Sequence, residues 1–170
     1  DSAGNHGIIG EGDVQWMTAG SGLLHKEYHE EGFSKAGGLF QMVQLWVNLP
    51  AAHKKTKPKY QEITHPQMGR HILDDGKSFI EVIAGTYQET KGPAFTFSPM
   101  EVYNARLQKN ATARIRLPAH YNTGMLVIEG NVEINGSNVA TDHFVLFRNE
   151  GEEIQLKAAE NSIVLILSGE

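Results

Sequence analysis

The sequence predicts an all-β fold of antiparallel strands, and three observations lead to that prediction. Apolar and polar residues alternate along many segments, as in strands with one buried face. Gly and Asn residues separate these segments at short, regular intervals. Helical periodicity is nearly absent, with room for a helical turn only at 65–71 and 139–143. Many short strands without helices are typical of a sandwich or a barrel.

The alternation is clearest at 40–49, where Val43, Leu45 and Val47 share one face and Pro50 ends the segment. The other predicted strands are, in chain order, 14–19, 23–29, 79–84, 94–97, 101–107, 113–117, 125–134, 144–147, 153–156 and 162–167. Two turns are predicted beside them. Gly10-Glu11-Gly12 precedes the first strand, and Asn135-Gly136 is the dipeptide that a type I′ hairpin favours.

A shift in composition divides these strands into two β units. Residues 51–60 carry four Lys residues around Pro58 and almost no apolar side chain, which predicts an exposed connection. We therefore expect a first unit at 1–50, a linker at 51–62 and a second unit at 63–170. The alternative interpretation of the basic residues is a docking patch for a protein partner.

Composition and charge exclude several classes of protein. A chain of 170 residues with 40% hydrophobic content can bury a core, and without Cys it can form neither disulfides nor thiolate metal sites. The net charge of −5 gives no electrostatic basis for binding nucleic acid or an anionic membrane. The longest apolar run, 163–167, is too short to span a bilayer. We expect a cytoplasmic monomer, or a nuclear one in a eukaryote, that binds a small molecule or a protein.

Eight His residues and no Cys direct the search for chemistry to imidazole and carboxylate groups. On a strand at 23–29, His25, Glu27 and His29 would project from one face and Lys26 from the other. His25 and Glu27 could then bind one divalent ion, such as Fe(II), Mn(II), Ni(II) or Zn(II). The alternative interpretation of this charged stretch is a solvated strand edge.

Three other features offer less chemistry. His120 stands alone in a predicted turn. Asp142 and His143 are adjacent, so on a strand they point to opposite faces and cannot form a catalytic dyad. Gly20-Ser21-Gly22 lacks the Walker pattern and is expected to form a β-turn instead of a phosphate-binding loop.

Three motifs in order make the first third of the chain recognisable. Gly-Asp-Val-Gln-Trp-Met-Thr-Ala-Gly occupies 12–20, a His-x-Glu occupies 25–27, and Gln-Leu-Trp-Val-Asn-Leu-Pro at 44–50 is followed by Tyr-Gln-Glu at 60–62. With these motifs the sequence resembles the pirin family of the cupin superfamily. The resemblance is strong up to about Glu62 and weaker over the second β unit.

The resemblance implies a bicupin, in which two β-barrels face each other. Residues 1–50 would be the C-terminal part of the N-terminal, metal-binding cupin domain, and 63–170 the C-terminal cupin domain without metal ligands. Pirins bind one metal, typically iron, through three His and one Glu, and the His-x-Glu pair corresponds to His25 and Glu27. Mn, Ni, Cu, Co and Zn are the alternative metals.

The other two ligands in pirins come from a His-x-His on an earlier strand. That strand would precede Asp1, so we expect the first barrel to be incomplete and to show half of the ligand set. His6 lies where the turn after that strand is expected and is not assigned as a replacement. His29 would not bind the metal itself and would at most contact one of the ligands.

The resemblance implies two alternative functions. Several pirins resemble quercetin 2,3-dioxygenases, which open a flavonol ring with O₂ and release carbon monoxide; Glu27 would then be both metal ligand and base. Animal pirin is a nuclear iron protein that binds transcription regulators, which implies a non-catalytic, redox-sensing module that recruits a protein partner. A third alternative is that the chain folds without metal and does neither, because two ligands of four bind an ion weakly.

Overall fold

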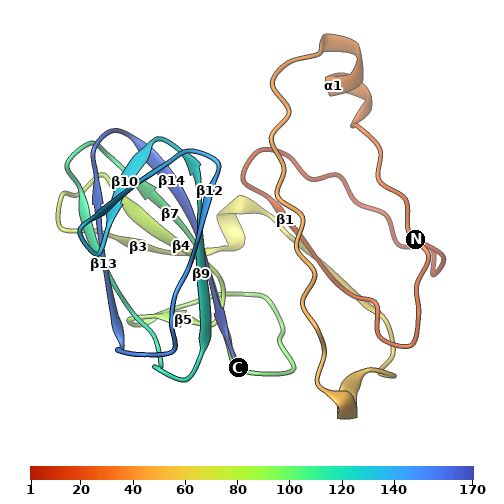
Figure 1. The fold of residues 1–170 in the computed structure, drawn as a ribbon. Helices are drawn as coiled ribbons and strands as arrows, with labels where there is room; N and C mark the ends of the chain where they lie inside the picture. The colour runs from red at the N-terminus through yellow and green to blue at the C-terminus, as the bar shows by residue number, and fades with distance from the viewer. The chain divides into compact units, whose positions relative to one another are not determined.

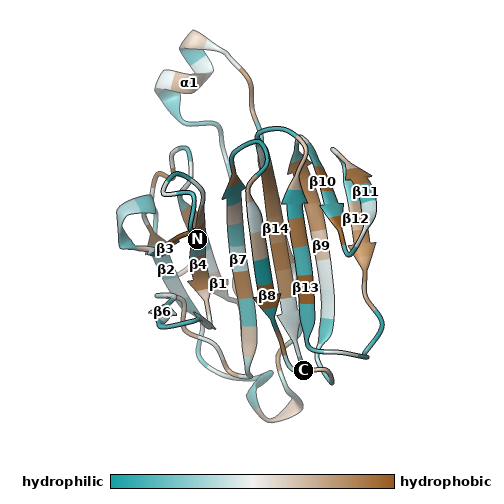
Figure 2. Cartoon of the chain, turned by 90° about the vertical axis from the view of Figure 1, so that its left-hand side faces the viewer, coloured by the Kyte–Doolittle hydropathy of each residue, from teal (hydrophilic) through white to brown (hydrophobic).

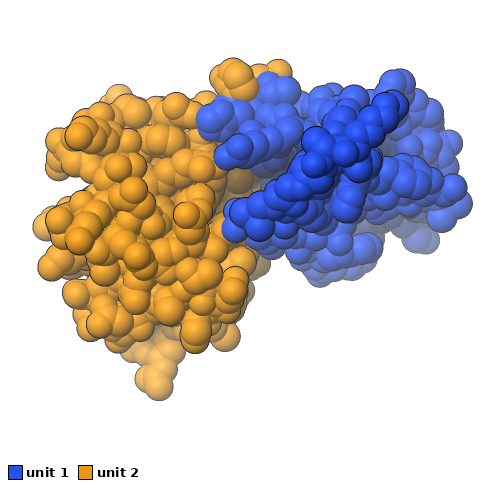
Figure 3. Space-filling view, turned by 90° about the horizontal axis from the view of Figure 1, so that it is seen from above, with its two compact units in different colours: residues 1–65 blue, residues 66–170 orange.

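The computed structural model describes residues 1–170 as two compact units, residues 1–65 and residues 66–170 (Figure 3). Strands pair in antiparallel fashion in both units, and the predicted all-β class is confirmed. The boundary between the units follows His65, three residues beyond the expected linker.

The first unit contains little regular structure. Its elements are β1 (Val14–Thr18), α1 (Glu31–Ala36), the 3₁₀ turn η1 (Ala51–His53) and β2 (Lys59–Ile63). β1 pairs with β2 from Val14 opposite Ile63 to Thr18 opposite Lys59. Residues 59–62 of the expected linker are therefore part of a strand, because Tyr60 and its neighbours complete a ladder with β1.

Two predicted strands of this unit, 23–29 and 40–49, are wrong as strands, although the chain runs extended through both (Figure 1). Alternation specifies which side chains share a face, but a strand also requires a neighbouring backbone to bond with. Neither segment forms a ladder.

A short helix that the sequence did not predict lies between these two extended segments. The Glu30 carboxylate accepts the backbone N–H of Phe33 at 2.8 Å and caps α1, and Gly37, with φ of 68°, ends it. Backbone N–H groups of Gly32 and Phe33 also lower the pKa of the Glu30 carboxyl.

The second unit consists mainly of two antiparallel sheets, with strand orders β11-β10-β13-β8 and β12-β9-β14-β7-β4-β3. It follows the 3₁₀ turn η2 (His65–Gln67) and contains β3 (Gly69–Ile72), β4 (Phe79–Ala84), β5 (Thr86–Tyr87), β6 (Thr90–Lys91), β7 (Met100–Leu107), β8 (Thr112–Arg116), β9 (Asn122–Glu129), β10 (Asn131–Ile134), β11 (Ser137–Ala140), β12 (His143–Leu146), β13 (Glu153–Ala158) and β14 (Ser162–Gly169).

Most predicted strands of the second unit are confirmed, but β3, β5, β6 and β11 were not predicted, and other differences follow. Residues 94–97 form no strand. The predicted strand 125–134 is two strands, because Gly130 turns the chain at φ of 84° and a Cβ there would lie 2.3 Å from the Ser162 hydroxyl oxygen. In place of a helical turn at 139–143, β11 ends at Ala140, residues 141–142 form a turn, and β12 begins at His143. The Asn135-Gly136 hairpin is confirmed, with φ of 47° and 81° at its two residues.

The two sheets of the second unit enclose one apolar core. Burial alternates along the strands, as in β13, and hydropathy alternates with it (Figure 2). The core members with no exposed surface include Ile80, Val82, Ile115, Met125, Val127, Val132, Val164 and Ile166. No helix in the structure has the length and apolar composition that crossing a bilayer requires.

Glu81 and Tyr103 are buried side chains of this unit whose polar groups have partners, although Arg70 and Arg106, the partners of Glu81, are partly exposed. Glu81 on β4 lies between Arg70, with Nη2 at 2.9 Å, and Arg106, with Nε at 3.5 Å. The Tyr103 hydroxyl on β7 lies within hydrogen-bond distance of the Thr86 carbonyl, at 2.7 Å, and of the Glu101 carboxylate, and either can accept its one proton. Burial, and then the hydrogen bond to Glu101, raise the pKa of Tyr103 far above its usual value.

Candidate metal centre

A tight turn leads from β1 into the segment that carries the candidate ligands. The Gly22 N–H donates to the Ala19 carbonyl at 2.9 Å, and the Ser21 N–H donates to the Thr56 carbonyl at 2.8 Å. Gly20 adopts φ of 51°, and a Cβ there would lie 2.2 Å from the Thr56 oxygen, so only glycine fits. The prediction of a β-turn at Gly20-Ser21-Gly22 is confirmed, and its contact with Thr56 anchors the start of the next segment.

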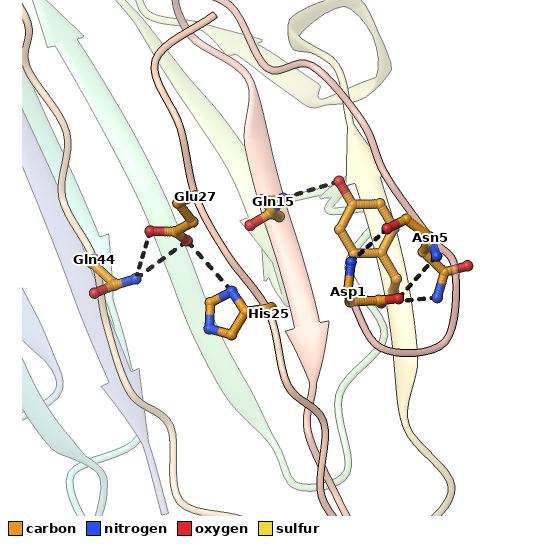
Figure 4. A network of polar contacts seen from close by, with 7 residues as sticks. Asp1, Asn5, Gln15, His25, Glu27 and Gln44 are labelled. Carbon is orange, nitrogen blue, oxygen red and sulfur yellow. Dashed lines mark hydrogen bonds and ion pairs between the residues drawn. The ribbon is translucent and has the colours of Figure 1, made fainter.

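His25 and Glu27 point toward each other from that segment (Figure 4). His25 Nδ1 lies 3.9 Å from Glu27 Oε1, and the two side chains are 30% and 43% exposed. The backbone here is not a strand, but it is extended, and extended backbone keeps the two-residue period that places alternate side chains on one side. Their proximity, which the sequence predicts, therefore holds even though the strand does not.

A third side chain, which sequence reasoning missed, contacts Glu27 of this pair. Gln44 lies on the extended segment 40–49, and its Nε2 is 3.3 Å from each oxygen of the Glu27 carboxylate (Figure 4). The only signal in the sequence is that Gln44 opens the run Gln-Leu-Trp-Val and alternates with the apolar Val43 and Leu45. Its contact with a residue 17 positions away depends on how the two segments lie.

The two candidate ligands fit part of a metal site. Imidazole nitrogen and carboxylate oxygen suit first-row divalent ions. Two donors that each lie about 2.1 Å from one tetrahedral ion are roughly 3.4 Å apart. Nδ1 and Oε1, which are 3.9 Å apart, would therefore move somewhat closer to share an ion. No group of three or more His, Asp and Glu side chains in the structure is arranged to hold an ion.

The remaining His residues that the sequence raised lie in other surroundings. The His29 ring packs against Phe33 and Phe40, with centroids 5.7 Å and 4.8 Å away, in an aromatic cluster beside α1. The His120 ring contacts Tyr121 edge-on. His143 Nδ1 lies 3.0 Å from the Thr141 carbonyl, and His6 is exposed.

A carboxylate near the start of β1 stabilises the loop before it. Asp13 accepts the N–H of Gly10 at 2.8 Å and the N–H of His65 at 2.7 Å. These two bonds, the one from Gly10 first, lower the pKa of the Asp13 carboxyl. The Asp13 N–H in turn donates to the Gly10 carbonyl at 3.1 Å, which confirms the predicted turn at Gly10-Glu11-Gly12.

Comparison with known proteins agrees with the motifs. The family model for pirin matches residues 1–47, and the model for the pirin C-terminal cupin domain matches residues 102–170. A Thermoplasma acidophilum protein, named as a candidate quercetin 2,3-dioxygenase, is 30% identical over 99% of this chain and 70% of its own length. The chain belongs to the pirin family.

Two further relatives are more similar to this pirin chain. A Pseudomonas aeruginosa protein, also named as a candidate quercetin 2,3-dioxygenase, is 39% identical over the whole chain. The crystal structure of a quercetin 2,3-dioxygenase from Acinetobacter baumannii is 43% identical and superposes on the whole chain with a TM-score of 0.94. The chain spans 59% of the length of each of these two proteins.

Proposed function

We propose that this pirin chain is part of a metal-dependent flavonol 2,3-dioxygenase and that His25 and Glu27 are two of its metal ligands. The observation that carries the proposal is the approach of His25 Nδ1 to Glu27 Oε1 at 3.9 Å within the His-x-Glu motif. The names of the Pseudomonas and Acinetobacter relatives support the reaction class.

The proposed reaction divides the work between the ion and Glu27. The proposed metal is Fe(II), with Mn, Ni, Cu, Co and Zn as alternatives; when bound, it would supply a Lewis-acid site for the flavonol oxygens and for O₂. An ionised carboxylate can only accept hydrogen bonds. Glu27 is therefore the group we assign to take the proton of the flavonol hydroxyl, while His25 holds its position as a neutral imidazole ligand.

A second candidate function is a non-catalytic, iron-dependent module that recruits a protein partner. Its support is the apolar surface of the first unit. Leu24, Tyr28, Leu39 and Trp46 are at least 80% exposed there, and exposed large apolar side chains in numbers are typical of surfaces that bind another protein.

The experiment that separates the two candidates supplies the purified protein with Fe(II), quercetin and O₂. Oxygen consumption with release of carbon monoxide is the expected result. Stoichiometric iron binding with no oxygen consumption and no carbon monoxide would contradict the dioxygenase function and favour the binding module.

The ligand assignment has its own test, by elemental analysis of purified variants. We expect His25→Ala or Glu27→Ala to lose the metal, because each removes one donor. Lys26 lies between them in sequence and is not a proposed ligand, so Lys26→Ala should retain the metal. Stoichiometric iron in either of the first two variants would show that the ligands lie elsewhere.

A further inference from the structure

The side-chain amide of Gln44 lies beside both oxygens of the Glu27 carboxylate. Its Nε2 is 3.3 Å from Oε1 and 3.3 Å from Oε2. Equal distances place the nitrogen between the two oxygens, on the outer side of the carboxylate (Figure 4). The amide donates to a group that the proposed function requires to be ionised, and hydrogen bonds to charged acceptors are stronger than those between neutral groups.

The same position is the one that a bidentate metal ion would take. A carboxylate can bind an ion through one oxygen or through both, and an ion held by both is also equidistant from them. The Gln44 amide and a bidentate ion therefore compete for the same side of Glu27. While Gln44 stays there, one oxygen at a time is available to an ion, and Oε1 is the oxygen that lies 3.9 Å from His25 Nδ1.

We propose that Gln44 is a positioning residue that holds Glu27 beside His25 and restricts its carboxylate to coordination through one oxygen. This inference rests on the proposed function of the pair as metal ligands. It also divides the two roles assigned to Glu27: Oε1, which faces His25, would coordinate the ion, and Oε2, which also accepts from Gln44, would use its other lone pair to take the flavonol proton.

The contact itself can be tested in metal-free protein by NMR. We expect nuclear Overhauser effects between the Gln44 side-chain amide protons and the Glu27 side chain, and a shift of the Gln44 amide resonances in Glu27→Gln. Amide resonances that match free glutamine, with no such effects, would overturn the proposal whatever the metal does. This measurement uses the protein with Gln44 in place, so it stands even where a Gln44 variant fails to fold.

The effect on coordination is tested with Co(II) alone, whose visible absorption reports the number and arrangement of its ligands. We expect Gln44→Met, which keeps the length of the side chain but removes the amide, to weaken Co(II) binding about tenfold, the lower end of the usual effect for residues that orient ligands. The absorption should change as well, because both oxygens become available. Met42→Leu is the matched control: Met42 is exposed and lies two residues earlier on the same side of the alternation.

The outcomes are distinct. Unchanged Co(II) affinity and absorption in Gln44→Met would overturn the positioning role while the proposed function stands. Failure of the unsubstituted protein to bind Co(II), with the Gln44 contact present by NMR, would overturn the ligand role of His25 and Glu27 and with it the role of Gln44 in coordination. If Met42→Leu changes Co(II) affinity and absorption as Gln44→Met does, the effect comes from the segment 40–49 and not from the Gln44 amide. That result would overturn the positioning role.

Discussion

Residues 40–49 in the first unit and β14 in the second are both apolar segments of strand length, but only β14 is a buried strand. Both are rich in apolar residues over a strand length, by alternation at 40–49 and as the continuous run 163–167 in β14. β14 pairs with β7 on one side and β9 on the other, and its Val164 and Ile166 are fully buried. Leu45 and Val47 on the other segment are 40% and 49% exposed. The pattern is sufficient to orient side chains, but burial depends on neighbouring strands.

The difference extends to the whole of each unit. In the first unit Thr18 and Ile63 are the buried residues, whereas in the second a continuous core connects the two sheets. The candidate ligands lie in the first unit, on backbone without a ladder. Stability and proposed chemistry are thus concentrated in different regions, and four predictions test that separation.

The largest effect is expected from removing part of the core. Ile166→Ala should lower the free energy of unfolding by about 2–5 kcal/mol, the usual cost of a large-to-small change in a packed interior. Trp46→Ala, at a side chain 87% exposed in the first unit, should change it by less than about 0.5 kcal/mol. Urea unfolding followed by circular dichroism measures both. Equal losses would contradict the comparison.

The next effect concerns the ion pairs that the buried Glu81 makes in the second unit. Glu81→Ala should lower the free energy of unfolding by about 2 kcal/mol, because it removes the buried carboxylate that the partly exposed Arg70 and Arg106 both contact. Glu153→Ala is the control, since Glu153 pairs with Arg116 at an exposed position and its removal should cost less. A larger loss for Glu153→Ala would mean that burial does not set the strength of these pairs.

A smaller effect, with a characteristic pH dependence, is expected at Tyr103. Tyr103→Phe should lower stability by about 1–2 kcal/mol at neutral pH through its lost hydrogen bonds. The pKa of Tyr103 is raised in the folded protein, so its contribution is complete below the unfolded value near 10 and declines at higher pH. Stability measured from pH 9 to 11 should therefore fall less steeply in Tyr103→Phe than in the unsubstituted protein; identical slopes would exclude this tyrosine as a source.

The smallest effect is local and belongs to the first unit. The pKa of Asp13 is lowered when folded, so its two backbone bonds are present above the unfolded value of 3.8 and are lost as pH falls through the lower folded pKa. The amide resonances of Gly10 and His65 should shift together in that acid range, and Asp13→Asn should remove the titration. If the Gly10 and His65 amide resonances shift at different pH values, the Asp13 carboxylate does not accept from both amides.

Some features of the site could be predicted from the sequence and others could not. The side shared by His25 and Glu27 follows from two-residue spacing in extended chain, and the glycine turn before them follows from Gly20-Ser21-Gly22. The Glu27 contact with Gln44 joins residues 17 apart, and no local pattern specifies it. The helix α1 lies outside the predicted elements because its six residues give too short a periodicity to detect.

The sequence by itself determined the all-β class, most strands of the second unit, the type I′ hairpin and the pirin family, because these depend on local spacing and on motifs. Tertiary structure alone decided which apolar segments became strands, which strand β2 pairs with, and that Glu81 is buried. Those outcomes depend on backbone hydrogen bonds and packing between segments far apart in the chain. A period of two residues specifies the faces of a segment; only a partner segment determines whether one of those faces is buried.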